Sequence, residues 1–210
     1  MTLSALDDLI ASRSLLKHPF YMKWSKGELT LEDLRVYAQE YFRLVERIPG
    51  IVARVRDRAS DADLRSRIEK NIAEETEHVE LWKRFAKSLG VEESELVSYQ
   101  PSAMVMDAVT SLETLAEGSL EDGVVAMYAL EAELPKIAET KKQGLCEFYD
   151  LTSEDAHVYF DEHLKEEEHL KVWRSLQVSD AASVIADQSL TAQNRVLDAV
   201  CAACGIGMEC

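Results

Sequence analysis

Histidines and carboxylates gather in one stretch of this 210-residue chain, Glu154–Trp173. The stretch contains His157, His163 and His169, and no Gly or Pro interrupts it. Because Leu, Glu and Lys favour helix, we predict that it is helical. Imidazoles and carboxylates three or four residues apart on a helix share a face and can point metal ligands into a core. The alternative is a solvated acidic face with incidental histidines, so the choice depends on matching ligands elsewhere in the chain.

Two other segments supply such ligands. Glu75 and His78 lie three residues apart, so a carboxylate and an imidazole could bind one metal there. Glu131 shares its side of a predicted helix with apolar residues, and burial of its charge without a partner would be costly. Carboxylates and histidines on facing helices are how bundles build two-metal sites for iron or manganese. We predict that these residues and the His163–His169 cluster bind metal; in the alternative each Glu caps a helix, pairs or faces water.

We predict that all the segments that position these ligands are helices. Thr30 and Asp33 resemble a capping box that opens one long helix, and Gly90 follows the end of the next. We find no convincing strand and no repeat. The expected architecture is an all-α, single-domain bundle of about seven helices with short connections. The predicted helices cover about residues 3–15, 30–58, 61–89, 102–118, 120–143, 154–173 and 180–203.

The charge of the chain excludes several classes of partner. A net charge of −16 would repel a polyanion over most of the surface, which argues against nucleic acid and against anionic membranes. No apolar run approaches the length of a membrane span, and the N-terminal residues lack the features of a signal peptide. We therefore expect a cytoplasmic protein that binds neither nucleic acid nor a membrane.

The cysteines do not indicate a disulfide scaffold. Cys201 and Cys204 have a CxxC spacing, but a single CxxC is weak evidence for a zinc or redox site. We interpret residues 1–205 as the helical domain and residues 206–210 as a cysteine-containing tail.

Five segments, which span nearly the whole chain in order, resemble one family of helical proteins. They are HPFYMKWSKGELTLEDL, VYAQEYF, NIAEETEHVELWKRF, VAMYALEAELPKIAETKKQGL and VYFDEHLKEEEH. They are similar to the Chlamydia protein associating with death domains (CADD) and to its bacterial relatives that make para-aminobenzoate for folate. These are haem-oxygenase-like di-metal oxidases, related to the pyrroloquinoline-quinone synthase C and thiaminase-II folds. The resemblance implies a haem-oxygenase-like bundle.

The resemblance also implies an unusual activity. In this family two metal ions (iron, or iron with manganese) activate dioxygen with the help of a reductant, and the protein consumes part of itself. One tyrosine side chain is cleaved to become the aromatic ring, and a lysine is implicated as the amino donor. The matching positions are Tyr21 for the sacrificed tyrosine, Tyr37 for a second functional tyrosine and Lys141 for the donor.

The metal-ligand positions of the family match Glu75, His78, Glu131 and His163, although the spacing of the first two is shorter here. The last motif departs further. The family has His-x3-Asp-x2-His, whereas here His169 comes one residue too early. Six residues place it about 120° around a regular helix from His163. Either the helix is locally distorted, with Glu166 or Glu167 and then His169 as ligands, or the register is Glu162, Glu166 and His169. We assign Glu167 with His163 and His169.

Alternatives to this assignment remain open. Tyr21 and Tyr37 could be ordinary core tyrosines, and Lys141 near a helix C-terminus could be solvated. His18 and His157 read as structural. A di-metal oxidase could instead act on a free small molecule, with Tyr21 only lining the pocket. An acidic helical surface could also dock a basic partner, as the death-domain name implies. We further expect a homodimer, because relatives of this fold often pair.

Overall fold

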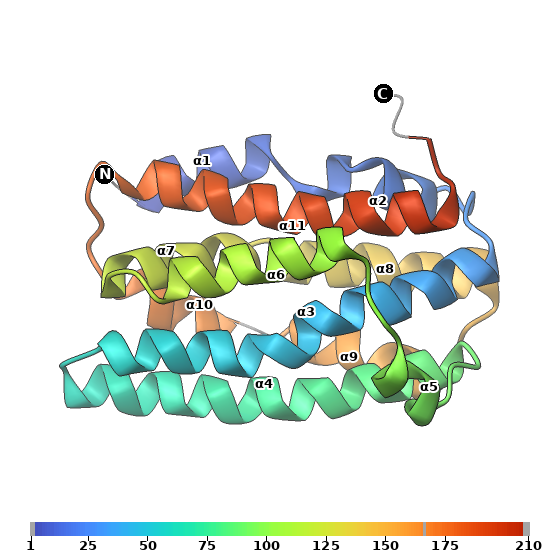
Figure 1. Ribbon diagram of the computed structural model, residues 1–210, viewed down its shortest axis with the longest axis horizontal. Coiled ribbons are helices and arrows are strands. Elements are labelled where there is room, and N and C mark those ends of the chain that lie inside the picture. The colour runs from blue at the N-terminus through green and yellow to red at the C-terminus, as the bar shows by residue number, and fades with distance from the viewer. Residues whose placement is uncertain (1–2, 166, 208–210) are drawn as a thin grey trace.

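The computed structural model describes residues 3–165 and 167–207, and these residues form helices and no strand. Figure 1 shows the helices running along the long axis of the molecule, with α1, α2 and α11 on one side, α3 and α4 on the other, and α6 to α8 between them. The predicted all-α bundle is confirmed, with more elements than expected. They are α1 (Leu3–Ser12), η1 (Leu15–Lys17), α2 (Pro19–Trp24), α3 (Leu31–Arg58), α4 (Ala62–Ser88), α5 (Glu93–Ser98), α6 (Ala103–Ala116), α7 (Leu120–Glu131), α8 (Leu134–Tyr149), α9 (Glu154–His163), α10 (Glu167–Arg174) and α11 (Ala182–Cys204).

Local sequence signals set most helix starts. The predicted capping box is present: the Thr30 side chain accepts from the Asp33 backbone, and Asp33 accepts from the Thr30 backbone. Asp61 and Ser102 cap α4 and α6 through their side chains. Gly90, which follows α4, has a φ of +83°, a conformation that glycine adopts without steric cost.

Two predicted helices are each divided in the structure. The segment 120–143 separates into α7, which ends at Glu131, and α8, which begins at Leu134. Pro135 explains this division, because proline lacks an N–H and its ring would clash with the carbonyl of residue 131. The segment 154–173 separates into α9 and α10. The predicted helix end at about residue 143 is wrong, since α8 continues to Tyr149 and is followed by the left-handed Asp150.

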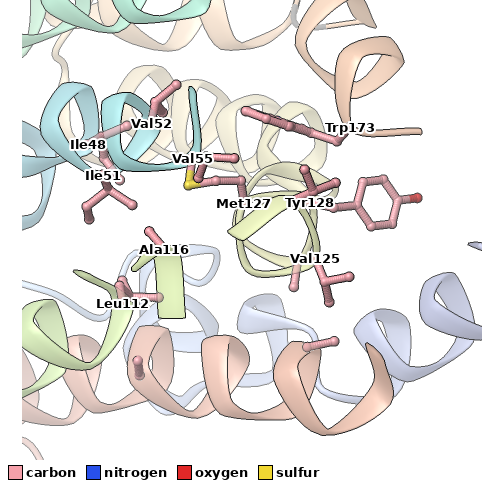
Figure 2. Close-up of a cluster of buried hydrophobic side chains, with 14 of the residues drawn as sticks. Ile48, Ile51, Val52, Val55, Leu112, Ala116, Val125, Met127, Tyr128 and Trp173 are labelled. Atoms are coloured by element: carbon pink, nitrogen blue, oxygen red, sulfur yellow. The ribbon is translucent and has the colours of Figure 1, made fainter. Parts of the chain in front are cut away.

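Two buried clusters make up the core. The aliphatic cluster joins α1, α3, α4, α6, α7, α10 and α11, and Figure 2 shows part of it around Val55, Met127 and Trp173. The aromatic cluster joins α2, α3, α4, α8 and α9 and includes Trp24 and Trp82. Tyr41, near the middle of α3, packs against both clusters. The two halves of the core therefore meet at α3.

Within the described part of the chain, no helix has both the length and the apolar character needed to cross a membrane.

Gly144 lets α2 and α8 approach closely. A Cβ at this position would lie 2.7 Å from Cδ1 and Nε1 of the fully buried Trp24. We expect Gly144→Ala to destabilise the protein by about 1–3 kcal/mol, because the indole has no room to yield. Urea denaturation measures this change.

Gly50→Ala is the matched control for Gly144→Ala. Gly50 lies in α3, and a Cβ there would meet nothing within 4 Å. This substitution should be neutral or stabilising by up to about 1 kcal/mol, because alanine has the higher helix propensity. Equal stabilities of the two variants would contradict the close approach of Trp24.

Candidate active site

Five of the predicted metal ligands come together in the interior of the bundle. Glu75 and His78 lie on α4, Glu131 is the last residue of α7, His163 is the last residue of α9, and His169 lies on α10. All five side chains are buried, although the chain is strongly acidic overall. Four helices thus converge on one cluster of ionisable groups, here called the carboxylate–imidazole cluster.

The break between α9 and α10 brings His163 and His169 to the same side. The ring centroids of these two histidines lie 4.6 Å and 6.3 Å from that of His78. A regular helix would have separated them by about 120°. Of our two alternatives, the structure has the locally distorted helix. Glu162 instead pairs with Lys165 at 2.9 Å and is partly exposed.

The third predicted ligand of this motif cannot be placed in the same way. Glu166 lies outside the described residues. Glu167 is the first residue of α10, but its side chain also lies outside what the structure describes. The choice between these two carboxylates stays a prediction.

Glu75 lies between two imidazoles. Its Oε2 is 3.3 Å from Nδ1 of His78, and its Oε1 is 3.5 Å from Nδ1 of His169. Burial favours the neutral carboxyl, but the contacts with His169 and His78 outweigh it and hold the pKa of Glu75 well below its usual range. Glu75 is therefore an ionised carboxylate in the interior, with one oxygen toward each histidine.

The Glu131 carboxyl group accepts a hydrogen bond from an indole. Nε1 of Trp173 donates to Oε2 of Glu131 at 2.6 Å, and Figure 2 shows Trp173 beside α7. Burial raises the pKa of Glu131 to about 8, although the charge of His169 opposes this shift. One oxygen each of Glu75 and Glu131 and one ring nitrogen of His169 lie within 4.8 Å of one another, so these three residues could hold a metal ion.

The two histidines that follow the break differ in charge. Burial lowers the pKa of His163 to about 3, and its Nδ1 donates to the Tyr159 carbonyl at 2.7 Å, so Nε2 is the lone-pair nitrogen. Burial also opposes a charge on His169, but Glu75, Glu131 and Glu74 outweigh it and raise the pKa of His169 to about 10.

One further observation indicates that the carboxylate–imidazole cluster fits a bound metal. Nδ1 of His169 is buried, and the nearby Oε1 of Glu75, at 3.5 Å, makes no hydrogen bond with it. Buried polar atoms without a partner are rare in native proteins and often mark an ion that is not shown. Imidazole and carboxylate donors together suit iron and manganese.

A second cluster surrounds Lys141, which α8 places against α2 and α3. Nζ of Lys141 donates to Oη of Tyr37 at 2.5 Å and lies 4.7 Å from the ring centroid of Tyr21. The hydroxyls of Tyr21 and Tyr37 are 3.4 Å apart. All three predicted catalytic residues thus meet in this phenol–amine cluster, and the alternative of a solvated Lys141 is wrong, since its side chain is buried.

Neighbouring contacts fix the helices that carry this cluster. His18 caps α2, because its Nδ1 accepts from the Phe20 backbone, and its Nε2 contacts Asp198 of α11 at 3.0 Å. Nε1 of Trp24 donates to the carbonyl of Lys141 at 3.2 Å, which ties α2 to α8. His18 is therefore structural, as expected.

Burial determines protonation in the phenol–amine cluster. It lowers the pKa of Lys141 well below the usual range and raises the pKa of Tyr21 and of Tyr37 well above theirs. Burial therefore favours the neutral amine, with its nitrogen lone pair, beside neutral phenols.

Tyr41 is a site residue that the sequence argument missed. It lines a cavity of about 30 Å³ with Glu75, Glu131 and His163, and another of about 10 Å³ with Lys141. Burial raises its pKa to about 12, and its hydroxyl interacts with that of Tyr21. Its position four residues after Tyr37, on the same helix face, was the available signal. Tyr41 thus stands between the phenol–amine cluster and the carboxylate–imidazole cluster.

Comparison with known proteins identifies the family. A model of the TENA/THI-4/PQQC family matches residues 6–203. The chain belongs to the TENA/THI-4/PQQC family. The 4-aminobenzoate synthase of Chlamydia muridarum is 36% identical over 166 residues, which cover 77% of this chain and 70% of that protein.

Solved structures of other proteins share the fold of this TENA/THI-4/PQQC chain. A domain of unknown function from Shewanella denitrificans, with a heme oxygenase-like fold, matches with a TM-score of 0.83 at 17% identity, over 97% of this chain and 93% of that one. A CADD-like protein of unknown function from Nostoc punctiforme matches with a TM-score of 0.70 at 17% identity, over 95% of each chain. The predicted resemblance and the haem-oxygenase-like fold are confirmed.

The CxxC pair of this TENA/THI-4/PQQC chain has the properties of structural thiols. Burial raises the pKa of Cys201 to about 11 and that of Cys204 to about 12. A reactive cysteine needs a lowered thiol pKa. Cys210 lies outside the described residues, and the boundary of the predicted tail stays a prediction.

The lowered pKa of Lys141 has a measurable consequence for stability. In the unfolded chain this amine binds a proton up to its ordinary pKa, whereas in the folded protein it loses the proton at a lower pH, so stability rises with pH between the two pKa values. We expect Lys141→Met to raise the melting temperature at pH 7, and the gain to shrink toward pH 10, where the unfolded amine also begins to lose its proton.

Lys142→Met is the matched control for this thermal scan. Lys142 is partly exposed and pairs with Asp161. Its substitution should leave the slope of melting temperature against pH unchanged. A slope shared by wild type and Lys141→Met would show that Lys141 is charged in the fold.

Proposed function

We propose that this protein is a 4-aminobenzoate synthase that uses two metal ions and dioxygen to convert its own Tyr21 side chain into product. The observation that carries the proposal is the Tyr21 ring, packed 4.7 Å from Nζ of Lys141 in a cluster that Tyr41 connects to the buried metal-ligand donors. The 36% identity to a chlamydial 4-aminobenzoate synthase supports the same product.

The carboxylate–imidazole cluster offers donors for two ions. His78 and His163 would hold one ion and Glu131 and His169 the other, with Glu75 between them, because each of its oxygens faces one histidine. Glu167 is a further proposed ligand. Iron, or iron with manganese, would supply the binding and reduction of dioxygen there, with electrons from a one-electron reductant.

The phenol–amine cluster supports transfer of nitrogen from Lys141. A neutral amine is nucleophilic, whereas an ammonium is not. Tyr37 contacts both Nζ of Lys141 and the hydroxyl of Tyr21, so it can pass a proton from the amine toward the leaving phenol oxygen. In the proposed conversion dioxygen cleaves the Cα–Cβ bond of Tyr21, so that Cβ becomes the carboxyl carbon and Cα takes a hydrogen to become a glycine residue. Nζ of Lys141 replaces the phenol oxygen, which leaves as water. Oxidation of Cε of Lys141 to an aldehyde, by a second dioxygen with electrons from the reductant, then releases Nζ as the amino group of the product. Dioxygen is the oxidant.

The sizes of the internal cavities favour Tyr21 over a free aromatic substrate. The two cavities between the clusters have volumes of about 30 and 10 Å³, whereas ligand pockets typically have about 300–1,000 Å³. A larger cavity of about 500 Å³ reaches His78 and His169 from outside, but Glu74, Glu77 and Glu162 line it. Such a lining disfavours a benzoate-like anion.

The proposed death-domain partner and homodimer are independent of this chemistry. Binding of a death domain that survives Glu131→Ala would identify an interaction role separate from catalysis.

Tyr21→Phe tests the sacrifice of this residue. It keeps the ring but removes the hydroxyl, so we expect no 4-aminobenzoate after exposure of the protein to iron or manganese, reductant and air. Intact mass should show loss of a side chain in the wild type and an unchanged mass in the variant. Tyr99→Phe, at a tyrosine that bonds Glu40 instead, should behave as the wild type. Normal yield from Tyr21→Phe would refute the self-sacrifice.

Glu131→Ala tests the metal centre. Removal of an inward carboxylate should lower the metal content by about one ion per chain, as measured by mass spectrometry of the metals. Glu133→Ala is the control, because Glu133 lies two residues away and pairs with Lys136 at 3.6 Å. Equal metal content in the two variants would contradict the assignment of Glu131.

A further inference from the structure

Glu74 connects the outside of the bundle to the carboxylate–imidazole cluster. It lies next to Glu75 on α4, but its side chain is 54% exposed and lines the cavity of about 500 Å³. Its Oε2 accepts a hydrogen bond from Nε2 of the buried His169. Adjacent carboxylates thus contact the two nitrogens of one imidazole, Glu74 from outside and Glu75 from inside.

This contact decides which nitrogen of His169 faces the cluster. Because a carboxylate only accepts, Nε2 keeps its proton, so Nδ1 is the nitrogen that would release a proton when a metal binds. Nδ1 is then turned inward, 3.5 Å from Oε1 of Glu75. A histidine that binds a metal usually donates its other N–H to a carboxylate or a carbonyl, which orients the ring and raises its basicity.

We propose that Glu74 is a positioning residue of the metal centre, which holds His169 by Nε2 so that Nδ1 binds the metal. This inference rests on the proposed metal centre and adds to it a residue that is not itself a ligand.

Two other members of the cluster are held in the same manner. Trp173 donates a hydrogen bond to one oxygen of Glu131, and the Tyr159 carbonyl accepts a hydrogen bond from Nδ1 of His163. His169 has a particular need for such a contact, because it lies on the eight-residue α10, beyond the break after α9. The helix that carries His163 therefore does not fix the orientation of the His169 ring.

The test is a titration of the whole chain with Co²⁺, whose visible absorption reports on bound imidazole. Glu74→Ala should weaken Co²⁺ binding at one site by about 10–100-fold, the usual effect of losing such a partner. Glu74→Gln should fall between wild type and Glu74→Ala, because its amide oxygen can still accept from Nε2. Glu77→Ala, which removes a charge from the same cavity, should keep the wild-type affinity. Equal weakening in Glu74→Ala and Glu77→Ala would overturn the proposal.

A double-mutant cycle separates positioning from general attraction of cations. In a His169→Ala background, Glu74→Ala should have no further effect, since the ring that it holds is gone. A further tenfold loss there would show that Glu74 acts without His169, and would overturn the proposal. Failure of the wild type to bind Co²⁺ would overturn the metal centre itself. Unchanged binding by Glu74→Ala, with normal binding by the wild type, would overturn only the role of Glu74.

Discussion

Glu75 keeps a negative charge inside the bundle, and the arrangement of four helices depends on how that charge is compensated. A buried carboxylate without partners would be strongly destabilising, so the imidazoles of His78 and His169 must lie beside it. His169 reaches this place because the chain breaks between α9 and α10. Glu131 reaches it because α7 ends there, three residues before α8 begins. Interruptions in the helices therefore serve the cluster.

The phenol–amine cluster differs from the carboxylate–imidazole cluster, because its surroundings disfavour charge. Among the described residues, aromatic rings surround Lys141, and this burial favours the neutral amine. The protein thus places a charged cluster of carboxylates and imidazoles beside a dry, aromatic one. Tyr41 lies between them, through the two small cavities that it lines. The proposed oxidation chemistry and a nucleophilic amine need these different environments within reach of one another.

Local sequence signals predicted a large part of this structure. Thr30, Asp61 and Ser102 were readable as helix starts because a cap needs only a side-chain oxygen next to the first turn. The pairing of Glu75 with His78 was readable because residues three apart share a helix face. Pro135 is also visible in the sequence, and by ending α7 it leaves Glu131 at a helix terminus inside the core.

What the sequence by itself determined is the set of donors, their helical spacing and the all-α class, because these depend on residues close together in the chain. What only the tertiary structure decided is burial. From the sequence alone, Lys141 is a solvated lysine near a helix end, whereas in the structure α2 and α3 cover it. Tyr41 is an ordinary core residue in the sequence, whereas in the structure it lines cavities on two sides. On a regular helix His169 would face away from His163, but the helix break turns its side chain inward. Burial depends on which distant helix covers a face, and spacing along one helix carries no information about that.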